Sequence, residues 1–279
     1  MRLLLLIIMA TMPALATAAA ELLATSAADF GRPHDLTLST DGRHLYVTDM
    51  EHDQVRVLDP QTLRDLGAFG KGELKRPHDV AFAGDGRLLV ADSDNDRVVL
   101  YRVDGAAATR IDTLPGRFAT PEGVAAAGAQ VAVSNVRQGT VVLYLQGRQV
   151  RSTGSIGQAR GQFLRPHDLE FGPDGRLYVA DPGNDRVQVL DATLSVVEVI
   201  GPPAVALNEP KYLALDPQGL LYVADQHNDR VVVLDAQRRE VAVIGAGQLN
   251  RPEGVAVRGE LVWVSDTYND RVLLYRWQR

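Results

Sequence analysis

The chain repeats one pattern six times, at intervals of about 44 residues. Each repeat opens with a proline, and these prolines are Pro33, Pro77, Pro121, Pro166, Pro210 and Pro252. In most repeats an apolar stretch leads to a glycine turn, a second apolar stretch ends in Asp, and a third follows Asn-Asp-Arg. Short strands that recur with a period of roughly 40 to 50 residues are typical of a β-propeller with one blade per repeat. We therefore predict an all-β, six-bladed β-propeller whose blades open near residues 32, 76, 120, 165, 209 and 251.

The apolar stretches predict strands that are covered on both faces. Residues 88–91 and 231–234 are continuous apolar runs, whereas a strand with one face in water alternates between apolar and polar residues. Blades stacked face to face around an axis cover both faces of a strand. Asp-Gly pairs, such as those that end at Gly86 and Gly175, are strong hairpin signals and join the first two strands of a repeat.

The two ends of the chain predict how the ring closes. The last repeat stops after its third strand, which includes Val272 to Tyr275, and it lacks a fourth. The missing counterpart is the segment Glu21 to Thr25, which precedes the first repeat. We expect this segment to pair with the last blade, because closure removes the exposed edges that invite aggregation. The repeats fill the chain, so residues 21–279 are predicted to form a single domain.

The first twenty residues predict a secretory signal peptide. Arg2 gives a positive start, residues 3–9 are apolar, and Ala16-Thr17-Ala18 is a small-residue cleavage site. The stretch is short for a lasting membrane anchor, although an uncleaved anchor is the alternative. We expect export to a periplasm or to the cell exterior, with no stable membrane anchor after cleavage. The chain has no Cys, so core burial alone must stabilise the fold.

Charge and motifs narrow the classes of function. The net charge is −6, and it becomes −7 once Arg2 is removed. The chain has no Lys/Arg run and no glycine-rich phosphate loop, which argues against a nucleic-acid partner. It has neither a Gly-x-Ser-x-Gly motif nor a thiol nucleophile.

The repeat resembles the NHL family of six-bladed propellers over essentially the whole chain after residue 20. The proline opener, the Asp-Gly hairpin, and Tyr-Val-Ala-Asp followed by Asn-Asp-Arg-Val carry this resemblance. It implies the propeller fold but no particular function, because propellers host both binding and catalysis.

One slot of the repeat collects polar residues at a single face. The residue after each opening proline borders the central channel, because the first strand of a blade is innermost. Read around the ring, this slot holds His34, His78, Glu122, His167, Lys211 and Glu253. Neighbouring loops add His52, His227 and Tyr268. Three imidazoles that converge on an axis are a donor set for Zn²⁺, so we predict a candidate zinc site at His34, His78 and His167.

The peptidyl-α-hydroxyglycine α-amidating lyases are NHL relatives that hold a catalytic zinc with three channel histidines. By this resemblance His34, His78 and His167 are the candidate ligands, and Asp35, Asp79 or Asp168 could serve a structural Ca²⁺. One departure is that the histidines fall on blades one, two and four, whereas the lyase uses alternate blades. The alternative is structural: Pro-His-Asp suits this turn, with Asp bonded to backbone N–H groups and His to a carbonyl or water.

Arginine recurs before the opening proline and offers a second candidate site. Arg32, Arg76, Arg165 and Arg251 form a collar that could bind a carboxylate or phosphate. The alternative is that each Arg pairs with an Asp of its own or a neighbouring blade. The evenly repeated Asp and Arg five residues apart, such as Asp92 and Arg97, indicate bracing of loops and blades. Blade three lacks this pattern, through either drift or specialisation of the mouth.

Two functions follow from these residues. The first is an exported binding propeller that presents its mouth to a protein, a peptide or a small anionic ligand. Its candidate ligand-binding residues are Arg32, Arg76, Arg165, Arg251, Glu122, Lys211, Glu253, His227 and Tyr268. The second is a divalent-metal-dependent lyase of the α-amidating type. The sequence favours binding, because the ligand spacing of the lyase is not reproduced and no catalytic group can be placed.

Overall fold

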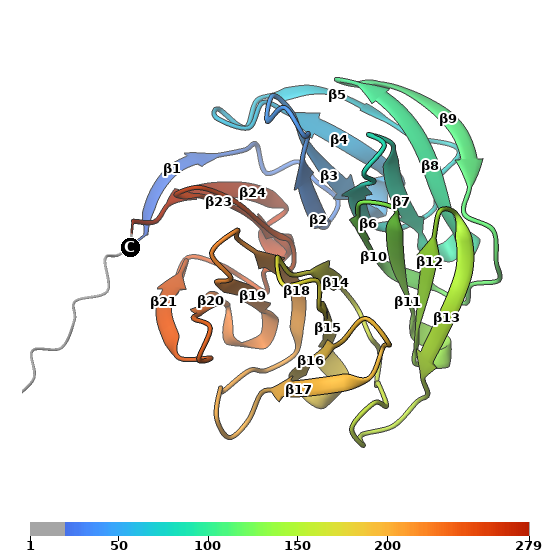
Figure 1. Cartoon of the computed structure of the whole chain (residues 1–279). Helices are drawn as coiled ribbons and strands as arrows, with labels where there is room; N and C mark the ends of the chain where they lie inside the picture. Colours follow the sequence, from blue (N-terminus) through green and yellow to red (C-terminus); the bar gives the residue numbers. More distant parts are fainter. Residues whose placement is uncertain (1–19, 279) are drawn as a thin grey trace, which may run out of the picture.

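The computed structural model describes residues 20–278 and forms six four-stranded antiparallel sheets arranged around a central axis (Figure 1). The all-β, six-bladed β-propeller predicted from the repeat is therefore confirmed. The predicted signal peptide lies, apart from Ala20, outside the described residues. Within residues 20–278 no helix is long and apolar enough to cross a membrane.

Blades one to five are each built from four consecutive strands, and the innermost strand of every blade lies at the axis. Blade one holds β2 (Pro33–Leu38), β3 (Leu45–Asp49), β4 (Gln54–Leu58) and β5 (Asp65–Phe69). Blade two holds β6 (Pro77–Phe82), β7 (Leu88–Asp92), β8 (Arg97–Asp104) and β9 (Ala107–Thr113). Blade three holds β10 (Pro121–Ala127), β11 (Gln130–Asn135), β12 (Thr140–Leu145) and β13 (Arg148–Gly154).

The second half of the ring repeats this order. Blade four holds β14 (Leu169–Phe171), β15 (Leu177–Asp181), β16 (Arg186–Leu190) and β17 (Val196–Ile200). Blade five holds β18 (Pro210–Leu215), β19 (Leu221–Asp225), β20 (Arg230–Leu234) and β21 (Glu240–Ile244). Blade six holds β22 (Val255–Arg258), β23 (Leu261–Asp266) and β24 (Arg271–Arg276), and its outer strand is β1 (Glu21–Thr25).

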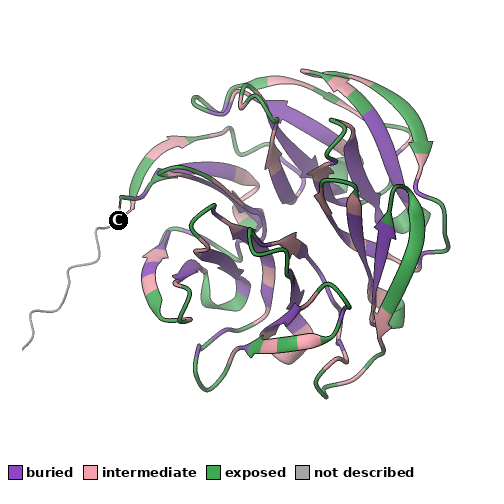
Figure 2. Ribbon diagram, in the orientation of Figure 1, coloured by how far each residue is buried: buried purple, intermediate pink, exposed green. Residues whose placement is uncertain are grey.

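The strands in the middle of each blade are buried on both faces, as the continuous apolar runs predict. Every residue of β7 and of β19 is buried (Figure 2). The apolar clusters lie between blades: one joins Leu36 and Val47 of blade one to Trp263 and Leu274 of blade six. The hydrophobic core is thus divided among the interfaces of neighbouring blades, and each blade is stabilised by two neighbours.

A short 3₁₀ turn joins the second and third strands of every blade. These turns are η1 (Met50–His52), η2 (Ser93–Asn95), η3 (Val136–Gln138), η4 (Pro182–Asn184), η5 (Gln226–Asn228) and η6 (Thr267–Asn269). Each ends at a residue with positive φ, which is Asp in five blades and Gly139 in blade three. Asp and Asn tolerate this left-handed conformation better than most residues, and Gly has no side chain that opposes it.

The aspartate that ends each turn also joins neighbouring blades. Asp53 accepts a hydrogen bond from the Arg76 N–H at 2.8 Å, and Asp270 accepts one from the Arg32 N–H at 3.1 Å. The residue before each opening proline has a positive φ in all six blades, including Arg76 (45°) and Arg165 (62°). Gly139 offers no carboxylate to Arg165, so blade three lacks this bond to blade four.

Ring closure follows the prediction. β1 pairs antiparallel with β24, with Leu22 opposite Tyr275 and Thr25 opposite Leu273. In Figure 1, β1 lies along the outer edge of β24. The first and last segments of the chain are therefore combined in one blade.

Candidate functional site

The inner strands run from one face of the disc to the other and so define two ends of the channel. We call the face with the opening prolines and 3₁₀ turns the mouth face, and the face with the turns between the first two strands the hairpin face. The residue after each opening proline lies near the mouth. This position is the shared slot that the sequence predicts.

The structure brings His34, His78 and His167 together at the channel axis. Their ring centroids are 4.8 Å apart for His34 and His78, 6.0 Å for His78 and His167, and 6.4 Å for His34 and His167. All three side chains are buried. They form a layer beneath the mouth surface rather than an exposed collar.

Each imidazole faces a carboxylate of the same slot. The His34 Nε2 lies 3.1 Å from Glu253 Oε2, and the Nε2 atoms of His78 and His167 lie 3.9 and 3.4 Å from Glu122. Burial lowers the pKa of His34 and His167 well below the usual value, and burial raises the pKa of Glu253 to about 7. In the contact between His34 and Glu253, imidazole and carboxyl are therefore both driven toward their neutral forms.

The second nitrogen of two of these rings is fixed by the backbone. The His34 Nδ1 donates to the Arg32 carbonyl at 3.1 Å, and the His78 Nδ1 donates to the Arg76 carbonyl at 2.8 Å. This leaves Nε2 as the lone-pair nitrogen, which is also the arrangement that supports metal-binding histidines. The buried His167 Nδ1 has no hydrogen-bond partner among the described residues.

The donor types suit zinc, but the arrangement does not unite them on one ion. Among residues 20–278 no three His, Asp or Glu side chains are placed so that they could hold a metal ion together. The zinc site at the three histidines stays a prediction, as does the calcium site at Asp35, Asp79 and Asp168.

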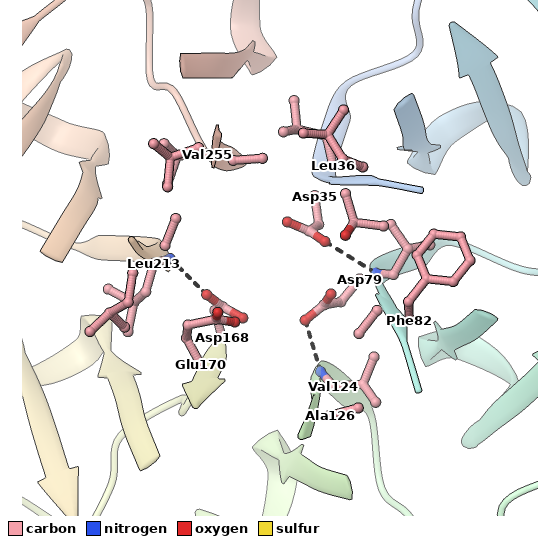
Figure 3. A pocket seen from close by; sticks show the side chains of 18 of the residues that line it. Asp35, Leu36, Asp79, Phe82, Val124, Ala126, Asp168, Glu170, Leu213 and Val255 are labelled. Atoms are coloured by element: carbon pink, nitrogen blue, oxygen red, sulfur yellow. Dashed lines mark hydrogen bonds between the residues drawn. The ribbon is translucent and has the colours of Figure 1, made fainter. Parts of the chain in front are cut away.

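The three aspartates lie one residue further along the channel and join blades. Asp35, Asp79 and Asp168 accept hydrogen bonds from the backbone N–H groups of Val80, Val124 and Leu213, at 3.2, 2.8 and 2.7 Å (Figure 3). In each case the N–H donor belongs to the next blade of the ring. Burial raises the pKa of all three carboxyls well above the usual value, and their mutual repulsion adds to this shift.

Tyr212 is a channel residue that the sequence analysis missed. It follows Lys211 in β18, and its hydroxyl donates to the His78 carbonyl of blade two at 2.8 Å. Its ring lies 4.9 Å from that of His167, and the residue is buried. Tyr212 therefore helps the imidazoles to fill the mouth end of the channel. The signal was present, because the slot after Lys211 holds Asp or Gly in the other five blades.

The members of the arginine collar differ in the groups that they contact. Arg76 lies 3.9 Å from Asp94 of its own blade, and Arg165 lies 2.8 Å from Glu209 of the next. His227 also approaches Glu209, at 3.5 Å. The contact of Arg76 matches the structural alternative, whereas Arg165 pairs with a Glu rather than the expected Asp.

Arg32 and Arg251 instead meet at one exposed tyrosine. Their guanidinium carbons lie 4.8 and 4.9 Å from the centroid of the Tyr268 ring, which is 37% exposed. Arg32 also pairs with Glu51 at 3.2 Å. In the part of the chain that the structure describes, no carboxylate lies within ion-pair distance of Arg251. Blade one and blade six thus place two cations around one aromatic ring.

The evenly repeated Asp and Arg brace four of the six blades from within. Asp92 is fully buried, accepts the Lys75 N–H at 2.6 Å, and binds Arg97 Nε at 2.6 Å. The same contacts recur at Asp181, Asp225 and Asp266. Blade three lacks the Asp and Arg pair. Its Asn135 still accepts the Ala119 N–H at 2.6 Å, so blade three keeps the backbone contact of the brace.

Comparison with known proteins agrees with this architecture. The NHL repeat family model matches residues 74–101 and 163–190. A structure of catalytically inactive virginiamycin B lyase from Staphylococcus aureus, a histidine-to-alanine variant with Quinupristin, is 12% identical. It has a TM-score of 0.64 and covers 90% of this chain and 82% of that chain. A streptogramin B lyase structure is 14% identical, with a TM-score of 0.65 and coverage of 93% and 87%. At these identities the likeness shows the fold alone, and the chain is a six-bladed β-propeller that carries NHL repeats.

Proposed function

We propose that this protein is an exported recognition propeller that binds an acidic peptide segment at its mouth face. The observation that carries the proposal is the group formed by Arg32, Tyr268 and Arg251, which we call the Arg-Tyr-Arg group. Arginine and tyrosine are the residue types most often found at the energetic centre of protein interfaces.

The charge arrangement of this group favours an anion. Two guanidinium groups around one ring repel each other, and a carboxylate between them would relieve this repulsion while forming charge-assisted hydrogen bonds. The Arg251 guanidinium has no carboxylate partner within residues 20–278, so it needs to give up none when a ligand binds. The exposed Tyr268 ring adds apolar contact area beside the charged groups.

Binding of labelled peptides tests the proposal directly. The purified mature protein would be titrated into fluorescein-labelled hexaglutamate and hexaglutamine, with fluorescence anisotropy as the readout. We expect hexaglutamate alone to bind, more weakly at high salt, because exposed charges are screened. Replacement of Arg251 by Gln should weaken binding about tenfold, which is about 1.4 kcal/mol.

The matched control is Arg43→Gln, which removes an exposed arginine from the hairpin face. It should leave hexaglutamate binding unchanged. Equal losses in Arg251→Gln and Arg43→Gln would show a general charge effect and contradict a site at the mouth. Equal binding of hexaglutamine would contradict the anionic ligand.

A metal-dependent lyase is the second candidate, and the convergence of three imidazoles favours it. The fold likeness to virginiamycin B lyase and streptogramin B lyase is compatible with it. Against it, no three His, Asp or Glu side chains within residues 20–278 are placed for one ion, and the nearby Lys211 ammonium and Arg76 guanidinium add positive charge that opposes a dication. Recognition therefore remains the function that the geometry supports best.

A further inference from the structure

A second candidate site lies toward the hairpin face, at the end of the channel opposite the mouth. A cavity of about 360 Å³ extends from Asp35, Asp79 and Asp168 toward Thr40 and Arg258. Thr40 lies next to the turn between β2 and β3, so the cavity leads to the hairpin face. Its size falls in the range of small-molecule sites, which is roughly 300 to 1,000 Å³.

Glu170 distinguishes this cavity from a plain structural channel. Glu170 pairs with Tyr178 of β15, and the residues in the equivalent register position of the other blades are Thr37, Ala81, Ala125, Ala214 and Ala256. Five blades thus form with a small side chain where blade four carries a carboxylate. The repeat itself gives no structural reason for Glu170.

The Glu170 side chain is partly buried, and its carboxylate has no partner among the described residues. It points into the cavity beside Asp168 (Figure 3). Within residues 20–278 no hydrogen bond or ion pair engages its side chain, whereas the three aspartates each accept a backbone N–H. A partly buried carboxylate without a partner is unfavourable unless a proton or a cation compensates it.

The lining supplies no such cation. Arg258 is the sole basic residue among the cavity-lining residues, and it is exposed. A Cβ atom built on Gly42 would lie 1.8 Å from an Arg258 guanidinium nitrogen, so this group packs on the turn at the hairpin face. Four carboxyl groups therefore share the inner part of the cavity, and the one positive charge lies at its rim.

The walls indicate an organic cation. Apolar side chains alternate with the carboxyl groups around the cavity, and they include Leu36, Phe82, Val124, Ala126, Leu213 and Val255 (Figure 3). Calcium takes six to eight oxygen ligands, and no set of three acidic or imidazole groups in residues 20–278 is placed for one ion. A primary ammonium has three N–H donors, which suits several separate carboxyl groups.

We propose that this cavity binds a small primary alkylamine, with its ammonium at Glu170 and the three aspartates and its hydrocarbon chain against the apolar walls. The buried imidazoles and Tyr212 fill the mouth end, so the ligand enters from the hairpin face. This site lies apart from the Arg-Tyr-Arg group and does not depend on the function proposed there.

Isothermal titration calorimetry with n-pentylamine tests the proposal. We expect one pentylamine per chain, while 1-pentanol and pentanoate, which lack the ammonium, should not bind measurably. Replacement of Glu170 by Ala should weaken pentylamine binding at least tenfold. This variant should fold, since four other blades carry Ala at that position, and thermal unfolding checks that it does.

The matched control is Glu260→Ala, which removes an exposed carboxylate elsewhere and should bind pentylamine like the parent protein. Equal pentylamine binding by folded Glu170→Ala would overturn the proposal, as would equally tight binding of 1-pentanol. Calcium chloride forms the last arm of the experiment. One Ca²⁺ per chain with no pentylamine binding would assign the cavity to a metal ion and refute the amine.

Discussion

At the residue scale, the most informative positions are those where one blade departs from the others. The slot after the opening proline holds three His, two Glu and one Lys, and the structure converts this variety into buried His-Glu contacts. His34 and His78 are alike in their Nδ1 contacts, but His167 lacks one. Residues in equivalent slots are therefore not equivalent in chemistry, because each meets different neighbours across the axis.

The first prediction concerns metal at these histidines. After exposure to Zn²⁺ and desalting, we expect elemental analysis to find well under one zinc per chain. The Lys211 ammonium opposes a bound dication, and no three donor side chains within residues 20–278 are placed for one ion. The comparison is a variant with His34, His78 and His167 all changed to Ala, whose folding is checked by thermal unfolding. One zinc per chain that is lost in the folded variant would contradict this expectation and favour the lyase.

At the element scale, the buried aspartate at the end of the second strand organises five of the six blades, and Asn135 takes its place in blade three. Asp92 holds the Lys75 N–H, the Asn95 amide and the Arg97 guanidinium. These contacts connect the second strand, the 3₁₀ turn and the third strand with the segment before the opening proline. The brace is local to a blade, whereas the aspartate that ends the turn reaches the next blade. Of these two aspartates in one short loop, the first thus stabilises its own blade and the second stabilises the contact with the next blade.

We predict that Asp92→Ala lowers the free energy of unfolding by about 3 kcal/mol, because the Lys75 N–H and the Arg97 guanidinium lose their buried partner. Asp92→Asn should cost roughly 1 to 2 kcal/mol, since an amide oxygen can keep the backbone contact, as Asn135 does in blade three. Urea-induced unfolding measures both. Asp85→Ala, on an exposed hairpin, is the control with a small effect. An equally small effect of Asp92→Ala would refute the role of the brace.

At the scale of the whole molecule, closure of the ring joins the two ends of the chain. β1 pairs with β24, Thr267 Oγ1 donates to the Pro33 carbonyl, and Trp263 Nε1 donates to the Pro60 carbonyl. The last two bonds join blade six to blade one independently of β1. Closure therefore has a strand-pairing part and a blade-packing part.

We predict that a chain lacking residues 21–26 folds but melts about 6 to 12 °C lower than a chain that begins at Ala20. The lost pairing is worth roughly 3 kcal/mol for a domain of this size. Size-exclusion chromatography should also show concentration-dependent association, because the free edge of β24 is exposed. An unchanged melting temperature with a monomeric elution profile would show that β1 contributes little to closure.

The sequence by itself determined the number of blades, the hairpins, the buried strands and the pairing of Glu21 to Thr25 with the last blade. These features follow from local patterns that recur with each repeat, so every blade provides the same information again. The shared slot of His34, His78 and His167 could also be predicted, because strand order alone places it at the axis.

Only the tertiary structure decided what these residues contact. The crossing of Tyr212 to the His78 carbonyl depends on the diameter of the channel. The Arg-Tyr-Arg group requires Arg32 and Arg251, from opposite ends of the chain, to meet at Tyr268. The cavity that Glu170 lines is formed by residues of all six blades around the axis. The physical reason is that contacts across the axis and across the closure are set by how six blades pack together, and no local pattern records that packing.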